Sequence, residues 1–234
     1  MPRTPKPTTA ATQRKPGKRA GLDLQQIVDA ARLIDVDALS MQSLADRLRV
    51  DRKALNYHVK DKQTLLGLVA MDAFSARFSG TDVTKADSWE DACRIYGMGF
   101  FEGVLGVGGL AEYLWFGGSV AAWALEPSEA LFQRLNDAGF ADETAVRLVA
   151  MLISMSLSHA RDATQSSAEG DRPRTRALKA ALRDAEPVTY KNLSRIAELG
   201  VDTYGNAQME VMLGMLIAGA RTLLEKSTAP PRLR

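Results

Sequence analysis

Apolar residues recur at intervals of three and four along most of the chain, and this spacing constrains the fold more than any other feature. Between residues 22 and 36 the apolar positions that share one helix face are Leu24, Ile27, Val28, Ala31 and Ile34,. We find no sustained alternation with a period of two, so we expect no strands. The spacing predicts further helices over 40–49, 51–59, 61–79, 89–105, 110–125, 127–138, 142–165, 174–185, 189–199 and 204–226. The sequence therefore predicts an all-α fold.

Charge is distributed unevenly along the chain. Residues 1–62 hold 13 Lys and Arg against 7 Asp and Glu, whereas the remainder holds 17 against 21. Residues 1–20 contain four prolines, six basic residues and no acid, so we expect a disordered basic arm. A basic N-terminal segment followed by a mildly acidic remainder is typical of a protein that binds a polyanion. A solvated tail has the same composition.

Residues 40–59 carry the pattern that bears on function. Ser40 and Asp51 can cap two short helices joined by a tight turn around residues 48–51. Four polar side chains then fall on one face of the second helix, away from Leu55, namely Arg52, Lys53, Asn56 and Tyr57. Such a face fits the major groove of DNA. The alternative is a plain helical hairpin with a solvated face.

Residues 22–79 resemble the DNA-binding domain of the tetracycline-repressor family, most clearly at ALSMQSLADRLRV (38–50) and ALNYHVKDKQTLL (54–66). The resemblance implies a helix-turn-helix domain at 21–79 and a helical ligand-binding and dimerisation domain at 80–234. It implies a homodimer that binds a palindromic operator in double-stranded DNA and responds to a small-molecule effector. The DNA-contacting positions that it implies are Ser40, Gln42, Arg52, Lys53, Ala54, Asn56, Tyr57, His58 and Lys62.

Three places depart from the family pattern within this domain. A glycine is usual between the first two helices, and this chain has Asp35, Val36 and Asp37 there. Arg49 replaces the usual glycine of the turn, and it would be strained by about 1 kcal/mol or more if the turn is left-handed there. Asn56 replaces a common tyrosine, so it could read adenine instead of contacting a phosphate.

Aromatic residues and glycines gather between residues 89 and 123, which contains all three tryptophans of the chain. Such a segment could line an apolar cavity or form an ordinary core. The candidate pocket residues are Phe100, Phe101, Trp115, Phe116, Trp123, Met155 and His159. His159 could bond a ligand, but a histidine on an apolar helix is more often satisfied within the core.

The two long helices predicted over 142–164 and 204–225 are candidates for a dimer interface. Their proposed stripes are Leu148, Leu152 and Met155 on the first helix, and Val211, Met212, Met215 and Leu216 on the second. Family members commonly pair these helices into a four-helix bundle. Methionines are adaptable, so these residues could also border the pocket.

Other classes of protein are disfavoured. The sequence has no zinc-protease, nucleophile-elbow or phosphate-loop motif, so we expect no catalytic residues, no cofactor and no metal. Its single cysteine cannot form an intramolecular disulfide,. No signal peptide is expected, because the first 20 residues have no apolar core. No membrane span is expected over residues 103–125, because that stretch is broken by Glu112 and contains many glycines,. We therefore expect a cytoplasmic bacterial regulator of transcription, most simply a repressor associated with the nucleoid when bound to DNA. The alternative is a DNA-binding protein without an effector.

Overall fold

The computed structural model describes residues 21–116, 122–165, 172–184 and 189–228, and those residues are helical with no strand among them. The predicted all-α fold is confirmed. The predicted basic arm over residues 1–20 lies outside the described residues. Two compact units make up the chain, Met1–Lys60 and Asp61–Arg234.

The first unit consists of α1 (Leu24–Ala31), α2 (Met41–Leu48) and α3 (Arg52–His58), with α2 packed on both α1 and α3. Its buried side chains are Ile27, Val28, Ala31, Leu39, Met41, Leu44, Ala45, Leu55 and Val59. Each helix begins at a side-chain cap, because Asp23, Ser40 and Asp51 each accept a hydrogen bond from a free backbone N–H of the first turn,. These caps separate three short helices within fewer than forty residues.

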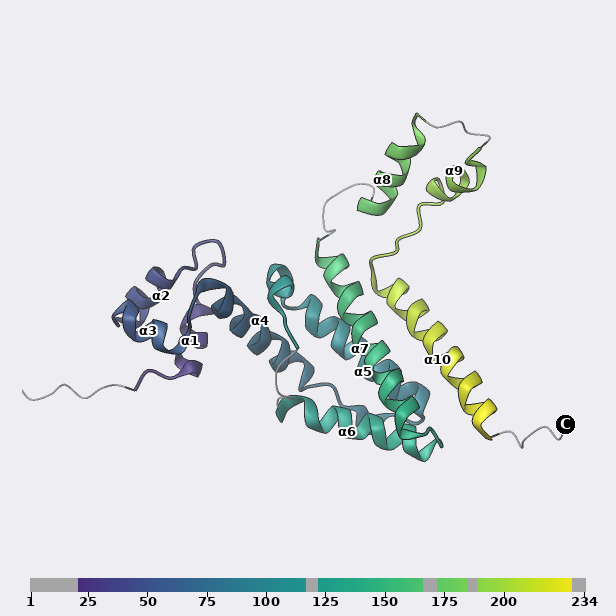
Figure 1. Cartoon of the computed structure of the whole chain (residues 1–234), viewed down its shortest axis with the longest axis horizontal. Coiled ribbons are helices and arrows are strands. Elements are labelled where there is room, and N and C mark those ends of the chain that lie inside the picture. The colour runs from purple at the N-terminus through teal and green to yellow at the C-terminus, as the bar shows by residue number, and fades with distance from the viewer. Residues whose placement is uncertain (1–20, 117–121, 166–171, 185–188, 229–234) are drawn as a thin grey trace, which may run out of the picture. The chain divides into compact units, whose positions relative to one another are not determined.

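The second unit contains seven α-helices among its described residues, and Figure 1 shows their succession from blue to yellow. They are α4 (Lys62–Phe78), α5 (Trp89–Leu105), α6 (Ala122–Asp137), α7 (Asp142–Gln165), α8 (Pro173–Leu182), α9 (Lys191–Ala197) and α10 (Asn206–Thr228). Two 3-10 helices accompany them, η1 (Val83–Lys85) and η2 (Gly108–Tyr113). Helix α5 is central, since it packs against α4, α6, α7 and α10.

The close packing of α5 depends on Gly97. A Cβ atom at this position would lie 2.7 Å from Leu213 Cδ2 of α10 and 2.8 Å from Leu152 Cδ1 of α7. Both leucines are fully buried. The missing side chain therefore lets three helices meet at one point.

The boundary between the units lies between Lys60 and Asp61, whereas the sequence analysis placed the domain boundary between residues 79 and 80. Helix α4 explains the difference, because it packs on α5, α6 and η2. Its buried stripe, from Leu65 to Phe78, belongs to the core of the second unit. The assignment of separate functions to 21–79 and 80–234 stays a prediction.

The predicted helices over 110–125 and 127–138 are wrong in their boundaries. The chain instead forms the short η2 and then one helix, α6, which continues through Pro127. Proline removes only one backbone donor here, the one that would bond the Trp123 carbonyl in the first turn. Pro127, Leu131 and Leu135 are buried on one side of α6, and this packing holds the helix together across the proline.

Candidate nucleic-acid interface and effector site

The turn between α2 and α3 is tight and has defined hydrogen bonds. Arg49 has φ 54° and ψ 42°, the left-handed conformation. Its N–H donates to the Asp46 carbonyl at 3.2 Å, and the N–H of Val50 donates to the Ala45 carbonyl at 3.1 Å. This is the Schellman pattern that ends many helices, usually with glycine at the left-handed position. The turn therefore needs the conformation that the sequence analysis associated with strain at Arg49.

Helix α3 begins immediately after this turn and presents a polar surface. Asp51 Oδ1 accepts a hydrogen bond from the Lys53 N–H at 2.7 Å and fixes the first turn. Leu55 and Val59 are fully buried and anchor the helix. Its six predicted DNA-contacting residues are all exposed, namely Arg52, Lys53, Ala54, Asn56, Tyr57 and His58. Tyr57 is 87% exposed, so packing in the core does not explain why an aromatic residue occupies this position.

The remaining predicted DNA-contacting residues have different surroundings. Ser40 is half-buried, and its hydroxyl accepts the Ser43 N–H at 3.0 Å, so it serves as the cap of α2. Gln42 is exposed, and its side-chain amide donates to Asp46 Oδ1 at 2.8 Å. Lys62 is the exposed first residue of α4 and belongs to the second unit. The structure thus brings six of the nine residues together on α3 and places two at the start of α2.

Three predicted pocket residues lie in one aromatic cluster with two phenylalanines of α4. The ring of Phe74 lies 5.0 Å from Phe100, 5.1 Å from Phe116 and 5.3 Å from Trp123, measured between centroids, and each pair is edge-to-face. Phe78 contacts Phe100 and Trp123 at 5.5 and 5.7 Å. The apolar spacing predicted a helix over 61–79 that contains Phe74, and no feature of the sequence linked this residue to the pocket. The aromatic residues therefore converge on α4, the helix that follows the first unit in the chain.

The other predicted pocket residues lie elsewhere. Phe101 stacks on His159 with centroids 5.1 Å apart, and the imidazole Nε2 is 3.1 Å from the Gly205 carbonyl oxygen. His159 is only 5% exposed, so this contact agrees with the interpretation of a histidine satisfied within the core. Met155 is half-buried on α7. These three residues contact no ring of the aromatic cluster among the ring contacts of the described chain.

Trp115 lies on a surface groove of about 640 Å³, and its side chain is 73% exposed. The groove is lined by the first turns of α4, the end of η2 and Arg161 of α7. Arg161 donates to the Ala111 carbonyl at 3.2 Å and to the Leu114 carbonyl at 2.5 Å. It therefore ties the end of η2 to α7, a role that nothing in its sequence context indicated.

Two buried titratable groups lie on α5. Burial raises the pKa of the Tyr96 phenol, while its hydrogen bond with Ser128, 3.2 Å between the oxygens, acts in the opposite direction. Burial also raises the pKa of the Cys93 thiol to about 12. Among the described residues, no three His, Cys, Asp or Glu side chains are grouped as a metal site would require.

These features define an all-helical protein with a helix-turn-helix near the start of the chain and a larger helical unit after it. A family model described as "Tetracyclin repressor-like, C-terminal domain" matches residues 83–224, which is more than half of the chain. The chain belongs to the tetracycline-repressor family. The resemblance inferred from residues 38–66 is thus confirmed by a different part of the sequence. Proteins of this family are transcriptional regulators rather than enzymes.

A curated relative agrees with this assignment. The chain is 27% identical over 144 residues to the tetracycline repressor protein class E of Escherichia coli, an alignment that covers 60% of this chain and 65% of that protein. It thus spans slightly less than two thirds of the length of that relative.

Solved structures show the same fold. Apo ActR from Streptomyces coelicolor superposes with a TM-score of 0.69 at 21% identity, covering 89% of this chain and 99% of that one. ActR in complex with actinorhodin gives 0.66 at 22% identity, with 86% and 96% covered. A single-residue variant of TetR from Acinetobacter baumannii AYE in complex with minocycline gives 0.56 at 20% identity, with 86% and 98% covered.

Proposed function

We propose that this chain is a transcriptional repressor that binds a palindromic DNA operator as a homodimer and is released by a small apolar molecule. The observation that carries the proposal is the surface of α3. Six exposed residues lie there on the second helix of a capped, tightly turned helix pair, and they include two cations, an amide and a phenol. Cations can bind phosphates, and Arg or Asn can read base edges in the major groove.

An unburied apolar surface on α10 supports the homodimer. Val211, Met215 and Leu223 of that helix are between 48% and 71% exposed. Over Asn206–Lys226, α10 is long and apolar enough to cross a membrane by length and composition alone, yet only 22% of its most apolar stretch is buried within the subunit. Pairing with a second copy would cover this surface, and two copies related by a twofold axis would read a palindrome.

Helix α7 contributes a different stripe to this interface than the sequence suggested. Leu148 and Leu152 are buried within the subunit, whereas Val146 and Met151 are exposed. The proposed interface therefore uses Val146 and Met151 of α7 rather than the leucines that face the core of the same chain.

The aromatic cluster on α4 supports an apolar effector. Aromatic rings with a polar pair nearby, Tyr96 with Ser128, suit a largely apolar molecule with a hydroxyl or carbonyl group,. ActR has been crystallised with actinorhodin and a TetR protein with minocycline. We propose that an effector in the cluster displaces α4 and so shifts the population of subunits away from the DNA-binding state. A regulator without an effector is the second candidate, because the rings already contact one another.

Selection of bound fragments from a random DNA pool tests the DNA proposal. We expect a palindromic consensus, and we expect Arg52→Ala and Tyr57→Ala each to weaken binding to it at least about tenfold, since one good base contact is worth about 1–3 kcal/mol. Arg94→Ala is the matched control, because Arg94 is an exposed cation of the second unit. Failure to select any consensus, or equal losses in all three variants, would contradict the proposal.

A thermal-shift screen of small apolar molecules tests the effector. A true effector raises the melting temperature and releases the selected DNA. Molecules that stabilise the protein while the affinity for DNA stays constant would favour the regulator without an effector.

A further inference from the structure

The turn between α2 and α3 places an arginine in a backbone conformation that belongs to glycine elsewhere in the described chain. The described residues with a positive φ are Gly108, Gly139, Gly200 and Arg49. A side chain at such a φ costs free energy that glycine does not cost. Arg49 therefore occupies the turn at a local cost, and a residue held in a strained conformation is a candidate for a role in function.

No polar contact within the described subunit accounts for the side chain of Arg49. The residue is exposed, and its guanidinium forms no hydrogen bond or ion pair with the described residues. The two nearest acids in the sequence have other partners. Asp46 Oδ1 accepts the Gln42 amide at 2.8 Å, and Asp51 Oδ1 accepts the Lys53 N–H at 2.7 Å. The free chain therefore contains no charged partner that would offset the cost of this backbone conformation.

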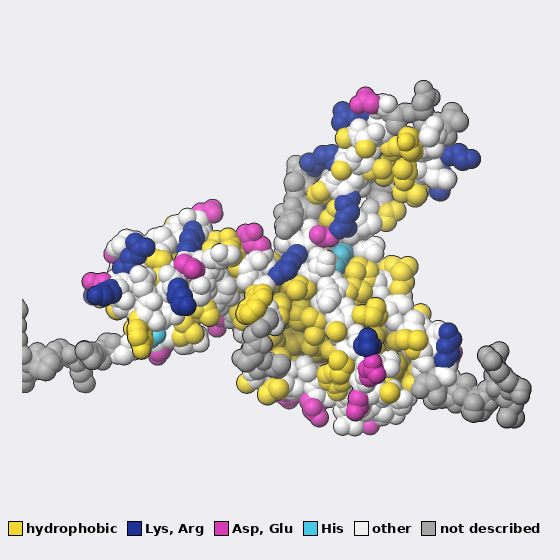
Figure 2. Space-filling model, viewed as in Figure 1, with side chains coloured by type: hydrophobic (Ala, Val, Ile, Leu, Met, Phe, Trp, Pro, Cys, Tyr) yellow, Lys and Arg dark blue, Asp and Glu magenta, His cyan; other side chains and the backbone are white. Residues whose placement is uncertain are grey.

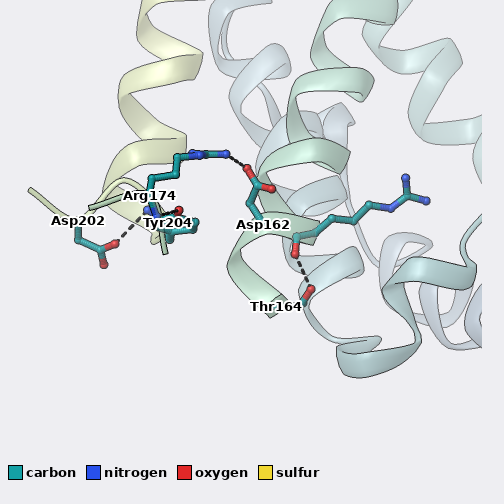
Figure 3. Close-up of polar contacts among 6 residues, drawn as sticks. Asp162, Thr164, Arg174, Asp202 and Tyr204 are labelled. Atoms are coloured by element: carbon teal, nitrogen blue, oxygen red, sulfur yellow. Dashed lines mark hydrogen bonds and ion pairs between the residues drawn. The ribbon is translucent and has the colours of Figure 1, made fainter. Parts of the chain in front are cut away.

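Arginines of the second unit show what a guanidinium does where the fold supplies a partner. Arg174 pairs with Asp162 near the end of α7, as Figure 3 shows, and lies 5.0 Å from the centre of the Tyr204 ring. Arg161 donates to two carbonyls at the end of η2. These guanidinium groups hold segments of one subunit together. Arg49 differs from them because its guanidinium is left available to a partner outside the chain.

The position of Arg49 in the first unit indicates which partner that is. Figure 2 shows Lys and Arg side chains over α1–α3 on the face in view. In a helix-turn-helix on DNA, the first helix of the pair crosses the backbone of the duplex and the second enters the major groove. Arg49 ends the first of these helices and lies three residues before Arg52, which begins the second. In that arrangement the DNA group nearest to the turn is a phosphate rather than a base edge.

We propose that Arg49 binds a phosphate of the DNA operator, a contact that the nine predicted DNA-contacting residues do not include. This inference rests on the proposed function, because it takes a DNA operator as given. An arginine suits the contact, since its planar guanidinium can donate two parallel hydrogen bonds to one phosphate. The backbone strain of the free protein is offset when the guanidinium gains this phosphate.

Variants of the full-length protein test the contact on the duplex selected from a random pool and on a duplex of mixed sequence. Arg49→Gly and Arg49→Asn both remove the charge, and both new residues tolerate the left-handed conformation. We expect each to weaken binding to both duplexes at least about threefold and by similar factors, because a phosphate contact carries no sequence information. Arg49→Lys keeps the charge and should restore most of the lost affinity.

The dependence of DNA affinity on salt measures the number of phosphates bound. Each phosphate contributes about 0.9 to the slope of log K against log salt concentration, so a homodimer without its two Arg49 contacts should lose about 1.8 from that slope. Arg47→Ala is the matched control, because Arg47 is an exposed arginine of α2 and residues two positions apart on a helix face different directions. We expect the control to change affinity less than about twofold and the slope less than about 0.5.

Stability of the free protein gives a measurement that a structural role of the side chain would not reproduce. Arg49→Gly relieves the backbone strain, so the midpoint of urea unfolding should rise while the affinity for DNA falls. An arginine that only stabilises the turn would lose stability and DNA affinity together, and parallel losses would overturn the proposal.

The remaining outcomes are equally decisive. An unchanged salt slope in Arg49→Gly, or equal losses in Arg47→Ala, would overturn the phosphate contact. A loss in Arg49→Gly but not in Arg49→Asn would assign the effect to flexibility of the turn, and a loss on the selected duplex alone would assign Arg49 to a base. Either result would also overturn it. Failure to select any consensus would contradict the proposed function, while the duplex of mixed sequence would still measure the Arg49 contact.

Discussion

Arg49 adopts a backbone conformation that normally selects glycine. A left-handed residue with a Cβ atom costs roughly 1–2 kcal/mol relative to the right-handed conformation. The hydrogen bonds that the N–H groups of Arg49 and Val50 donate to carbonyls of α2 hold this conformation in place. The residue sits between the two helices of the helix-turn-helix, so the strain is located where α3 receives its direction.

Replacing Arg49 by glycine should stabilise the protein. We expect Arg49→Gly to raise the free energy of unfolding by about 0.5–1 kcal/mol, because the relief of strain exceeds the extra entropy of an unfolded glycine. Arg47→Gly is the control, since Arg47 lies inside α2 and glycine there should cost about 1 kcal/mol. Urea unfolding of the transition that includes the first unit measures both. A loss of stability in Arg49→Gly would show that the arginine side chain makes a compensating contact.

Cys93 is an internal reporter for the second unit, because it is fully buried and the pKa of its thiol is raised to about 12. At pH 8 the native thiol should react with iodoacetamide at least about a hundredfold more slowly than in urea. Rapid native alkylation at pH 8 would contradict the buried position.

The same thiol links stability to pH. An unfolded chain ionises it near the ordinary pKa of 9.0, whereas the folded chain retains the proton until about 12. Above pH 9 the unfolded state therefore binds fewer protons than the folded state, and this group reduces stability as pH rises from 9 to 12,. Cys93→Ala should remove that contribution when urea unfolding at neutral pH is compared with unfolding near pH 10.

At the scale of single residues, the sequence predicts the role of a residue well when its partners are only a few positions away in the chain. Ser40 and Asp51 were expected as caps, and both accept the expected backbone hydrogen bonds. The contact between Arg172 and the Tyr204 ring was not expected, because the two residues are far apart in the sequence and only the folded chain brings them together. Local signals identify caps, whereas contacts between distant residues need the fold.

Among the elements, η2 is a short helix that depends on contacts with its neighbours. It is short, it has no side-chain cap, and it is held by Arg161 and by packing on α4. A Cβ atom at Gly67 of α4 would lie 3.4 Å from the Tyr113 carbonyl oxygen, so the two backbones lie close together. The end of η2 is therefore positioned between α7 and α4.

Removal of the Arg161 guanidinium should loosen η2. We expect Arg161→Gln to lower the free energy of unfolding by about 1–3 kcal/mol, because two carbonyls lose a charged donor. Arg147→Gln is the control on the same helix: Arg147 pairs with Glu143 at the exposed surface, and its loss should cost less than about 0.5 kcal/mol. Hydrogen exchange of residues 108–114 should accelerate only in the first variant. Equal acceleration in both variants would contradict the role of Arg161.

The errors in predicting elements also concern this region. A proline ends most helices, and on that rule the sequence analysis ended one helix before Pro127 and began another there. Burial of Pro127 with Leu131 and Leu135 outweighs the rule, and burial depends on which helices surround α6. The periodicity between residues 110 and 125 was similarly interpreted as one helix, although Gly108 has φ 62° and residues 108–113 form a short 3-10 helix.

For the whole molecule, the proposed dimer makes a prediction about small residues on α10. A Cβ atom at Gly219 would meet nothing within 4 Å in the subunit. Gly219→Ala should therefore stabilise the isolated subunit by up to about 1 kcal/mol through helix propensity. We expect the same substitution to weaken the dimer, because two α10 helices that approach closely leave little room for a methyl group.

Sedimentation at several concentrations measures the dimer, and thermal unfolding of dilute protein measures the subunit. Gly109→Ala is the control, because its surroundings are equally open but it lies in η2. Unchanged dimer affinity in Gly219→Ala would contradict close pairing of α10.

At the scale of the molecule the sequence predicted the family and the fold, because the helix-turn-helix has a dense local pattern. It did not predict which residues share the aromatic cluster. Phe100, Phe116 and Trp123 meet there with α4, while Phe101 stacks on His159 and Trp115 is exposed. Adjacent aromatic residues on a helix necessarily face different sides, and composition alone cannot divide them.

Pro127 has a consequence for the effector site that we propose in the aromatic cluster. Without a donor at that position, the Trp123 carbonyl lacks its usual partner four residues further along the helix. The first turn of α6 can therefore fray while the rest of the helix stays folded, as a locally unfolding segment does. Fraying would withdraw the Trp123 ring from Phe74 and Phe78 and create volume in a cluster that is otherwise filled by its own rings. A molecule that enters there would pass the first turn of α6. Its rate of entry would therefore follow the rate at which that turn unfolds rather than the rate at which the whole unit unfolds.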